Sequence, residues 1–172
     1  ALLRPEYMKE SDESAACMAA AEDRGVKVII ITSQTDIQLG STKLVIHPAD
    51  KVYENDASNN SSLVTEVFHG NNSLLFTGDI EKERIADIKY ELNDAGYDFL
   101  KVPHHGRYEK ILPEFFSLVG AQSAVITSSE KNPEDQETVQ ALEDAGAKDI
   151  LLTRGGEITL QSDGRKLDFT QK

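Results

Sequence analysis

Four helix–glycine–strand units recur along the chain and constrain its fold more than any other sequence feature. In each unit an apolar stripe with helical spacing stops at a glycine, and a short apolar run follows. The glycines are Gly25, Gly96, Gly120 and Gly146, and the runs that follow them are 26–32, 98–102, 123–128 and 150–153. Because each helix must cover a sheet with its apolar face, the units predict an α/β domain.

Three details of these units can be checked against a structure. The first stripe contains Cys17, for which we expect burial. Asn132 and Pro133 are expected to be the N-cap and the first residue of the last helix, because both residue types are favoured there. Residues 28–31 are all apolar, so we expect a strand covered on both faces.

The remaining segments have strand character without helices between them. Residues 44–46 form one short run, and 63–68 and 74–76 flank a turn at Gly70. Residues 158–160 are expected to pair with 167–169. The sheets are therefore predicted to be mixed. The polar run 57–62 is expected to be an ordered loop, since 172 residues are too few for two good cores.

Composition narrows the function classes. The chain has 30 acidic and 18 basic side chains, a net charge of −12, which argues against a broad nucleic-acid-binding surface but leaves room for a local phosphate site. No apolar stretch approaches a membrane span and no signal-like leader opens the sequence, so we expect a soluble chain. A single cysteine excludes an internal disulfide and a cysteine-rich zinc module.

Asp79 is the first candidate site residue. It follows the apolar run 74–76 through Thr77 and Gly78, at a strand end, where α/β proteins build their sites. The alternative is that Asp79 only caps the helix predicted to carry residues 83–93. A reciprocal capping box is absent, because the residue three positions later is Lys82.

His104 and His105 are the other candidates, and they lie between Pro103 and Gly106 after the strand 98–102. Successive side chains of an extended segment point opposite ways, so we expect one histidine to face Asp79. Its neighbour would orient a ligand, touch substrate or support the loop. A carboxylate and an imidazole at two strand ends indicate a metal such as zinc or manganese, and acid–base chemistry without a metal is the alternative.

Three motifs in this order resemble the metallo-β-lactamase superfamily, and in particular its ComEC-like hydrolase branch. They are residues 59–64, Thr77-Gly78-Asp79 with the strand before it, and Val102-Pro103-His104-His105-Gly106. The resemblance implies an αββα sandwich with two divalent ions, zinc or manganese, that activate water for hydrolysis. It implies that Asp79 bridges the metals. One of His104 and His105 would be a metal ligand and the other a substrate contact.

The sequence also departs from that family. The motif His-x-His-x-Asp-His is absent, since no two of the four histidines are separated by a single residue. Arg107 stands where the family has serine, and Asn132-Pro133 stands where relatives have His-Pro. Asp79, His104 and His105 are at most three ligands, so we expect this chain alone to bind metal weakly or to bind one ion. Residues 1–172 are therefore interpreted as one metallo-β-lactamase-like domain that lacks its N-terminal portion.

The resulting functional hypothesis is a metal-dependent hydrolase of phosphodiesterase or nuclease type, inactive as this chain alone. Its substrate would be a small molecule or a phosphodiester. A non-catalytic binding or structural module of the same fold is the alternative, and a doubly wound small-ligand domain is a third. If the strand 28–31 has lost part of its cover, we expect a homo-oligomer or a retained N-terminal fragment.

Overall fold

The computed structural model describes residues 1–8, 10–55, 57–92 and 96–172. Its strands are β1 Leu2–Pro5, β2 Val28–Ile31, β3 Thr35–Leu39, β4 Thr42–His47, β5 Val64–His69, β6 Asn72–Phe76, β7 Phe99–Lys101, β8 Ser123–Ile126, β9 Asp149–Leu152, β10 Ile158–Ser162 and β11 Leu167–Gln171. Its helices are α1 Asp12–Asp23, α2 Ala57–Asn60, α3 Lys82–Ile88, α4 Leu112–Val119 and α5 Gln136–Asp144, with 3-10 turns at Pro103–Gly106 and Thr153–Gly155.

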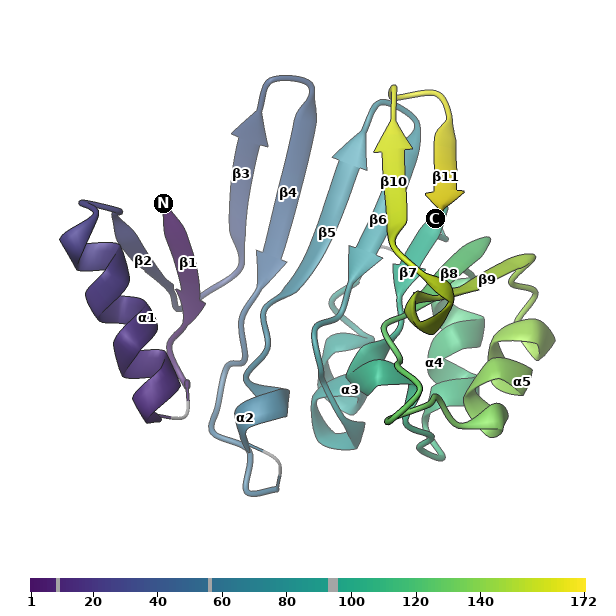
Figure 1. The fold of residues 1–172 in the computed structure, drawn as a ribbon, viewed down its shortest axis with the longest axis horizontal. Helices are drawn as coiled ribbons and strands as arrows, with labels where there is room; N and C mark the ends of the chain where they lie inside the picture. Colours follow the sequence, from purple (N-terminus) through teal and green to yellow (C-terminus); the bar gives the residue numbers. More distant parts are fainter. Residues whose placement is uncertain (9, 56, 93–95) are drawn as a thin grey trace.

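A seven-stranded mixed sheet forms the centre of the fold (Figure 1). Its strand order is β3-β4-β5-β6-β7-β8-β9. The pairs from β3 to β6 are antiparallel. Short turns connect β3 to β4 and β5 to β6, whereas the longer segment 48–63, which contains α2, connects β4 to β5. The pairs from β6 to β9 are parallel, with α3, α4 and α5 as crossover helices. The prediction of an α/β fold with mixed sheets flanked by helices is confirmed.

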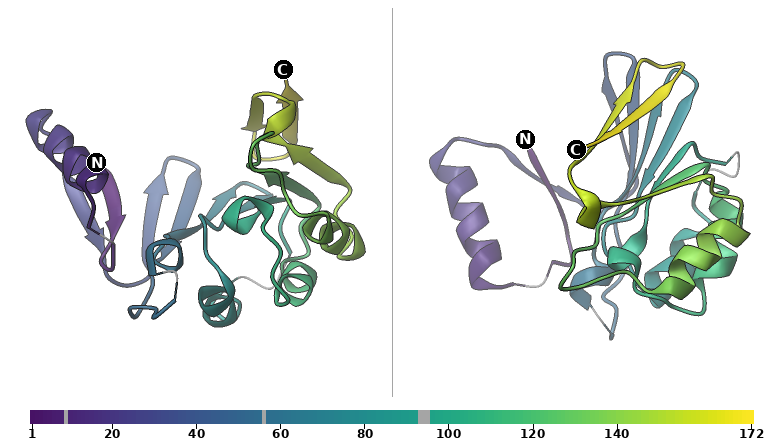
Figure 2. Two further views of the ribbon diagram at one scale, coloured as in Figure 1. Left: turned by 60° about the horizontal axis from the view of Figure 1, so that its bottom comes forward. Right: turned by 45° about the vertical axis from the view of Figure 1, so that its right-hand side comes forward.

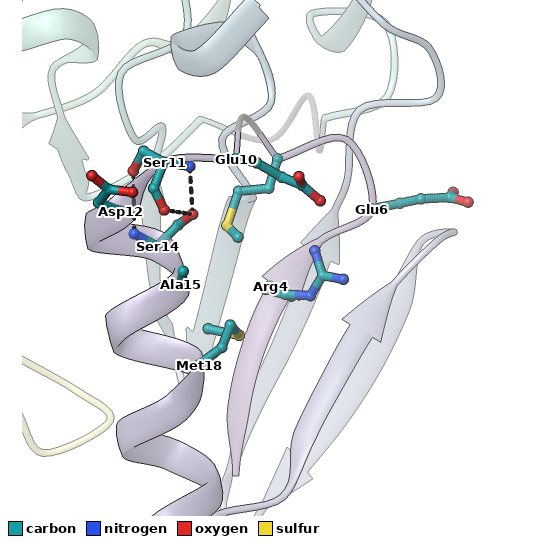
Figure 3. A pocket seen from close by; sticks show the side chains of 9 residues that line it. Arg4, Glu6, Glu10, Ser11, Asp12, Ser14, Ala15 and Met18 are labelled. Carbon is teal, nitrogen blue, oxygen red and sulfur yellow. Dashed lines mark hydrogen bonds between the residues drawn. The ribbon is translucent and has the colours of Figure 1, made fainter.

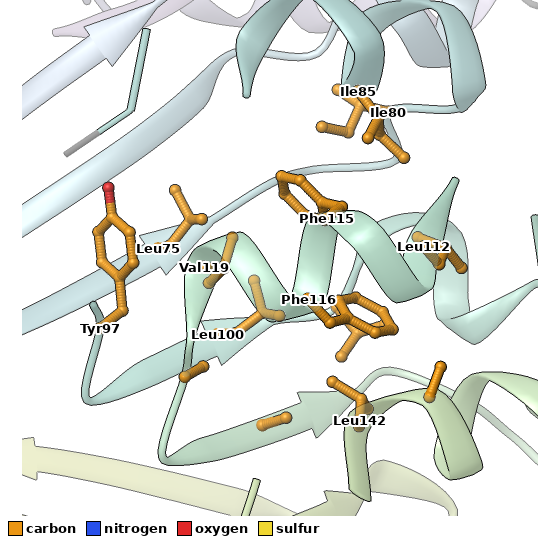
Figure 4. Close-up of a cluster of buried hydrophobic side chains, with 14 of the residues drawn as sticks. Leu75, Ile80, Ile85, Tyr97, Leu100, Leu112, Phe115, Phe116, Val119 and Leu142 are labelled. Carbon is orange, nitrogen blue, oxygen red and sulfur yellow. The ribbon is translucent and has the colours of Figure 1, made fainter. Parts of the chain in front are cut away.

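The helices α3, α4 and α5 cover one face of this sheet, and the main core lies beneath them (Figures 2 and 4). Phe115 and Phe116 of α4 pack there against Leu75 of β6 and Leu100 of β7. Gly120 ends α4 in the left-handed conformation, as its place after the apolar stripe predicts. Within the described ranges, no helix is long and apolar enough to cross a membrane.

The hairpin of β10 and β11 packs on the opposite face of the sheet. Leu160 pairs with Phe169 in an antiparallel register, which confirms the predicted pairing of the two runs. Phe169 lies against Phe99 of β7, with ring centroids 6.1 Å apart. Because side chains alternate along a strand, Leu74 faces this hairpin while Leu75 faces the helices.

A separate two-stranded sheet of β1 and β2, accompanied by α1, stands at the β3 end of the molecule (Figure 1). The expectation of a strand covered on both faces is wrong for β2, where Ile31 is buried and Ile30 is 47% exposed. The expected burial of Cys17 is also wrong, since its side chain is exposed. The reason is the same in both cases: this small sheet and α1 bury little surface, with Ala21 as the buried residue of α1.

Two helices begin later than their sequence signals indicate. The N-cap of α3 is Glu81, so Asp79 lies outside the helix and does not cap it. The prediction that this helix reaches residue 93 is wrong, because α3 ends at Ile88 and residues 89–92 are not helical. The N-cap of α5 is Asp135 and not Asn132. Asp135 accepts a hydrogen bond from the N–H of Tyr108 and donates its own N–H to the carbonyl of Gly106, which ties this helix start to the histidine loop.

The polar run 57–62 is ordered, as expected, although its first part forms the short helix α2 and not a loop. Asn59 and Asn60 of α2 hydrogen-bond to Glu81, and Ser62 accepts a hydrogen bond from the N–H of Asp79. The run therefore holds the segment that follows β6, which is where the candidate site lies.

Candidate metal centre

The parallel strands β6, β7 and β8 end at the same edge of the sheet, and the candidate site is built there. The chain leaves β6 towards Asp79, leaves β7 towards His104 and His105, and leaves β8 at Thr127. This placement at the carboxyl ends of parallel strands is the one the sequence predicts.

Asp79 is fixed by two contacts. Gly78 has a φ of +60°, and a Cβ there would lie 2.6 Å from Cβ of Ser62. Any residue with a side chain would therefore clash with Ser62 at this position. The N–H of Asp79 then donates to Oγ of Ser62 at 3.1 Å. On the carboxylate, Oδ1 accepts a hydrogen bond from Nζ of Lys101 at 3.0 Å.

The charge state of Asp79 follows from these neighbours. Burial raises the pKa of its carboxyl group. The hydrogen bond and charge of Lys101, together with the charges of His105 and His104, act in the other direction and outweigh burial. The pKa of Asp79 therefore lies below its ordinary value, and the group is an anion at neutral pH.

His105 faces Asp79. Its Nε2 lies 3.4 Å from Oδ2 of Asp79, and its Nδ1 lies 2.8 Å from the carbonyl oxygen of Thr127. Since a carbonyl can only accept a hydrogen bond, Nδ1 carries the proton, and in the neutral ring Nε2 keeps its lone pair. Metal-binding histidines in proteins are commonly oriented in this way, with the other ring nitrogen donating to a carbonyl or carboxylate.

His104 faces a different set of partners. Its Nδ1 lies 3.4 Å from Oε1 of Glu81. Ligand atoms of His104, Glu81 and Glu109 all lie within 4.8 Å of one another. Glu81 is positioned by α2, because its N–H donates to Oδ1 of Asn60 at 2.8 Å and its Oε1 accepts from Nδ2 of Asn59.

The two histidines point to separate partners for a reason that differs from the predicted one. They are not extended: φ is 43° at His104 and 53° at His105, both left-handed. Such a conformation costs on the order of 1 kcal/mol or more for a residue with a Cβ. Gly106 follows with a φ of +76°, and a Cβ there would lie 2.7 Å from Cγ2 of Ile126. Packing of this turn against β8 therefore holds the strained pair in place.

Sequence reasoning found Asp79, His104 and His105 but missed Glu81 and Glu109. Glu81 is only two residues beyond Asp79, a proximity that could have singled it out. Glu109 has no comparable signal, because its approach to His104 depends on the turn at the histidines. The structure places all three predicted residues at one edge of the sheet, and their roles as metal ligands stay predictions.

Two pockets are relevant to the search for a site. One of about 350 Å³ borders the histidines and is lined by His104, His105, Arg107, Thr127, Ser128, Ser129 and Asn132. Another of about 590 Å³ lies between β1 and α1 (Figure 3), with Arg4, Glu10 and Met18 in its lining. The second pocket contains none of the predicted site residues, so the chemistry points to the first.

Comparison with solved structures shows which known fold the chain resembles. Igni18, a metallo hydrolase from the archaeon Ignicoccus hospitalis, matches with a TM-score of 0.52 at 12% identity, over 99% of this chain and 80% of that one. YhfI, a metallo-β-lactamase fold protein from Bacillus subtilis, matches with a TM-score of 0.44 at 7% identity, over 84% and 56%. The chain shares its mixed α/β fold with Igni18, in line with the predicted fold class.

Comparison with curated proteins gives a particular relative. The chain is 28% identical over 132 residues to ComE operon protein 3 of Bacillus subtilis (strain 168), a match that covers 76% of this chain and 17% of that protein. The chain thus spans about a sixth of the length of the curated relative that it matches. The resemblance to the ComEC-like branch of the superfamily is confirmed. No family model matches the chain.

Proposed function

We propose that this domain is part of a metal-dependent hydrolase in which Asp79 and Nε2 of His105 hold a divalent ion, zinc or manganese. The observation that carries the proposal is the 3.4 Å approach of these two groups while Nδ1 of His105 donates to Thr127. An ion bound there would lower the pKa of a water molecule and polarise the bond to be cleaved. The name of Igni18, a metallo hydrolase of the same fold, supports this chemistry.

The residues present fit such an ion only in part. Asp79 and His105 supply two ligands, whereas catalytic zinc sites take three from protein and one from water. Lys101 also competes, because its ammonium group already contacts Oδ1 of Asp79. The proposal therefore includes at least one further ligand besides Asp79 and His105.

A phosphodiester is the proposed substrate. The pocket beside His104 and His105 carries Arg107. Its guanidinium lies 3.4 Å from Oδ1 of Asp135, and its remaining N–H groups can pair with phosphate oxygens. The hydroxyl of Ser129 and the side chain of Asn132 line the same pocket and can donate hydrogen bonds to an anionic group.

The test is hydrolysis of bis(p-nitrophenyl) phosphate with added Mn²⁺ or Zn²⁺, on the 172-residue chain and on any longer natural product of the same gene. We expect Asp79→Asn and His105→Gln to abolish metal-dependent turnover. The matched control is Asp149→Asn, an exposed carboxylate at the opposite edge of the sheet, where β9 begins. Turnover that survives Asp79→Asn would overturn the assignment of the site. Absence of turnover in every form would favour the non-catalytic module.

A further inference from the structure

The two histidines serve two different acidic groups, and this division has a consequence for metal binding. His105 faces Asp79, whereas His104 faces Glu81 and Glu109. Among the described residues, Glu81, His104 and Glu109 form a cluster of three side chains that can ligate a metal, and their ligand atoms lie within 4.8 Å of one another. Neither glutamate belongs to the motifs that identify the fold.

We propose that Glu81, His104 and Glu109 form a divalent metal site of their own, separate from the pair Asp79 and His105. The proposal does not require that the protein be a hydrolase. Three protein ligands leave coordination positions for water or another ligand. Because His104 also borders the 350 Å³ pocket, an ion held there would lie beside whatever the pocket binds.

The distances suit a small ion. Two ligand atoms of a tetrahedral zinc ion with bonds of 2.0 to 2.2 Å are about 3.3 to 3.6 Å apart. Nδ1 of His104 and Oε1 of Glu81 are already 3.4 Å apart. Glu109 has its ligand atom within 4.8 Å of the others, and the soft terminal torsion of a glutamate can close that distance.

The surroundings of Glu81 are those of an oriented ligand. Its side chain is 14% exposed, and Asn59 and Asn60 fix its carboxylate and its backbone N–H. Hydrogen bonds of this kind to a ligating carboxylate hold its oxygen in place for the metal. His104 is 32% exposed, so an ion can reach it from solvent.

Electrostatics favours a dication over a monocation. Two carboxylates at this separation repel each other, and a doubly charged ion between them removes the repulsion. Carboxylates suit Mn²⁺ and imidazole suits Zn²⁺, so the ligand set accepts an ion of intermediate hardness.

The experiment measures binding without substrate, which separates it from the test of hydrolysis. Mn²⁺ binding is followed by electron paramagnetic resonance, with Zn²⁺ as the competitor, in an Asp79→Asn background that removes the other pair. We expect saturable binding to persist there and to weaken at least about tenfold in Glu109→Gln and in His104→Asn. Glu109→Asp, which keeps the carboxylate, should weaken binding less than Glu109→Gln.

Glu130→Gln is the matched control, an exposed carboxylate in the loop after β8. Three outcomes would overturn the proposal: binding lost in Asp79→Asn but intact in Glu109→Gln, an equal loss in Glu130→Gln, or no saturable binding in any form. A second readout is the ¹⁵N resonance of the imidazoles. Zn²⁺ should shift the resonance of Nδ1 of His104 in the Asp79→Asn background. This readout does not need the Glu109 or His104 variants, so an unshifted resonance contradicts the site even if those variants are unstable.

Discussion

Nε2 of His105 lies 3.4 Å from Oδ2 of Asp79, and the other carboxylate oxygen of Asp79 is held by Lys101 at 3.0 Å. The carboxylate therefore stands between the imidazole of His105 and the ammonium group of Lys101. An ion that binds Asp79 must share the carboxylate with the ammonium group of Lys101 or displace it. Lys101 is thus expected to limit the affinity of this pair for metal.

The first prediction concerns this competition. Lys101→Met keeps the length of the side chain and removes its charge, so divalent ions should bind the Asp79 site more tightly. The pair of Lys101 and Asp79 is partly exposed, and such an ion pair contributes on the order of 1 kcal/mol, which corresponds to a gain of about fivefold. Titration with Mn²⁺ in a Glu109→Gln background isolates the effect. Lys43→Met, which breaks the exposed pair with Asp36, is the control. Weaker metal binding in Lys101→Met would show that Lys101 mainly positions the carboxylate of Asp79 and does not compete with the ion for it.

The part of the site that could be predicted is the part encoded locally. A strand followed by Gly78 and Asp79, and another followed by His104 and His105, place these side chains at one sheet edge once the two strands pair in parallel. The left-handed backbone of the histidines could not be predicted, because it depends on Gly106 packing against Ile126 of a later strand. The contact of Glu109 with His104 follows from that turn and was missed for the same reason.

The fold shows a similar division. The ends of α1, α4 and α5 at Gly25, Gly120 and Gly146 and the β10–β11 pairing follow from neighbouring residues, and these predictions are confirmed. The predicted helix end at Gly96 is wrong, because α3 already ends at Ile88. The exposure of Ile30 and Cys17 depends on how much surface packs on β2 and α1, which apolar patterning alone does not reveal. The N-cap of α5 is Asp135 and not Asn132, and Asp135 contacts Tyr108 and Gly106, which lie too far away in the sequence for local patterning to reveal the contact.

A second prediction tests how Gly78 places Asp79. Gly78→Ala should destabilise the fold, because its φ is +60° and its Cβ would meet Ser62 at 2.6 Å. Gly40→Ala separates the two causes: φ there is +59° but nothing lies within 4 Å. We expect about 1 to 2 kcal/mol for Gly40→Ala from backbone strain alone. Gly78→Ala should cost at least about 1 kcal/mol more through overpacking, and should also weaken metal binding. Equal losses in urea unfolding would contradict the steric account.

A third prediction concerns the helix-covered core. Phe115 of α4 is fully buried, whereas Leu118 on the same helix is 38% exposed. Phe115→Ala should lower the free energy of unfolding by about 3 to 5 kcal/mol, through lost burial and the cavity left behind. Leu118→Ala should cost less than about 1 kcal/mol, since more than a third of the Leu118 surface already meets water. Chemical denaturation of both variants measures the difference. Similar losses would mean that α4 packs less specifically than the structure shows.

The last prediction is a dependence of stability on pH at Asp87, on the far side of α3 from the core. Lys51 donates to its Oδ2 at 2.7 Å and the hydroxyl of Tyr53 donates at 2.9 Å. The hydrogen bond from Lys51 is the largest cause that lowers the pKa of Asp87, and that from Tyr53 adds to it against an opposing effect of burial.

The sign follows from the direction of this shift. A carboxyl group whose pKa is lower in the folded state stabilises the fold above its unfolded pKa of about 3.9 and loses that effect as the pH falls through the folded pKa. The side chain of Asp87 is 35% exposed, so solvent screening limits the contribution to about 0.2 to 1 kcal/mol. Asp87→Asn should therefore be less stable by this amount at pH of about 7.

The difference in the free energy of unfolding between the variant and the natural chain should disappear as the pH is lowered from about 5 to below the folded pKa. Urea unfolding at a series of pH values measures the gap, with the exposed Asp149→Asn as control. A gap that stays constant with pH would show that Asp87 acts through its shape and not through its charge.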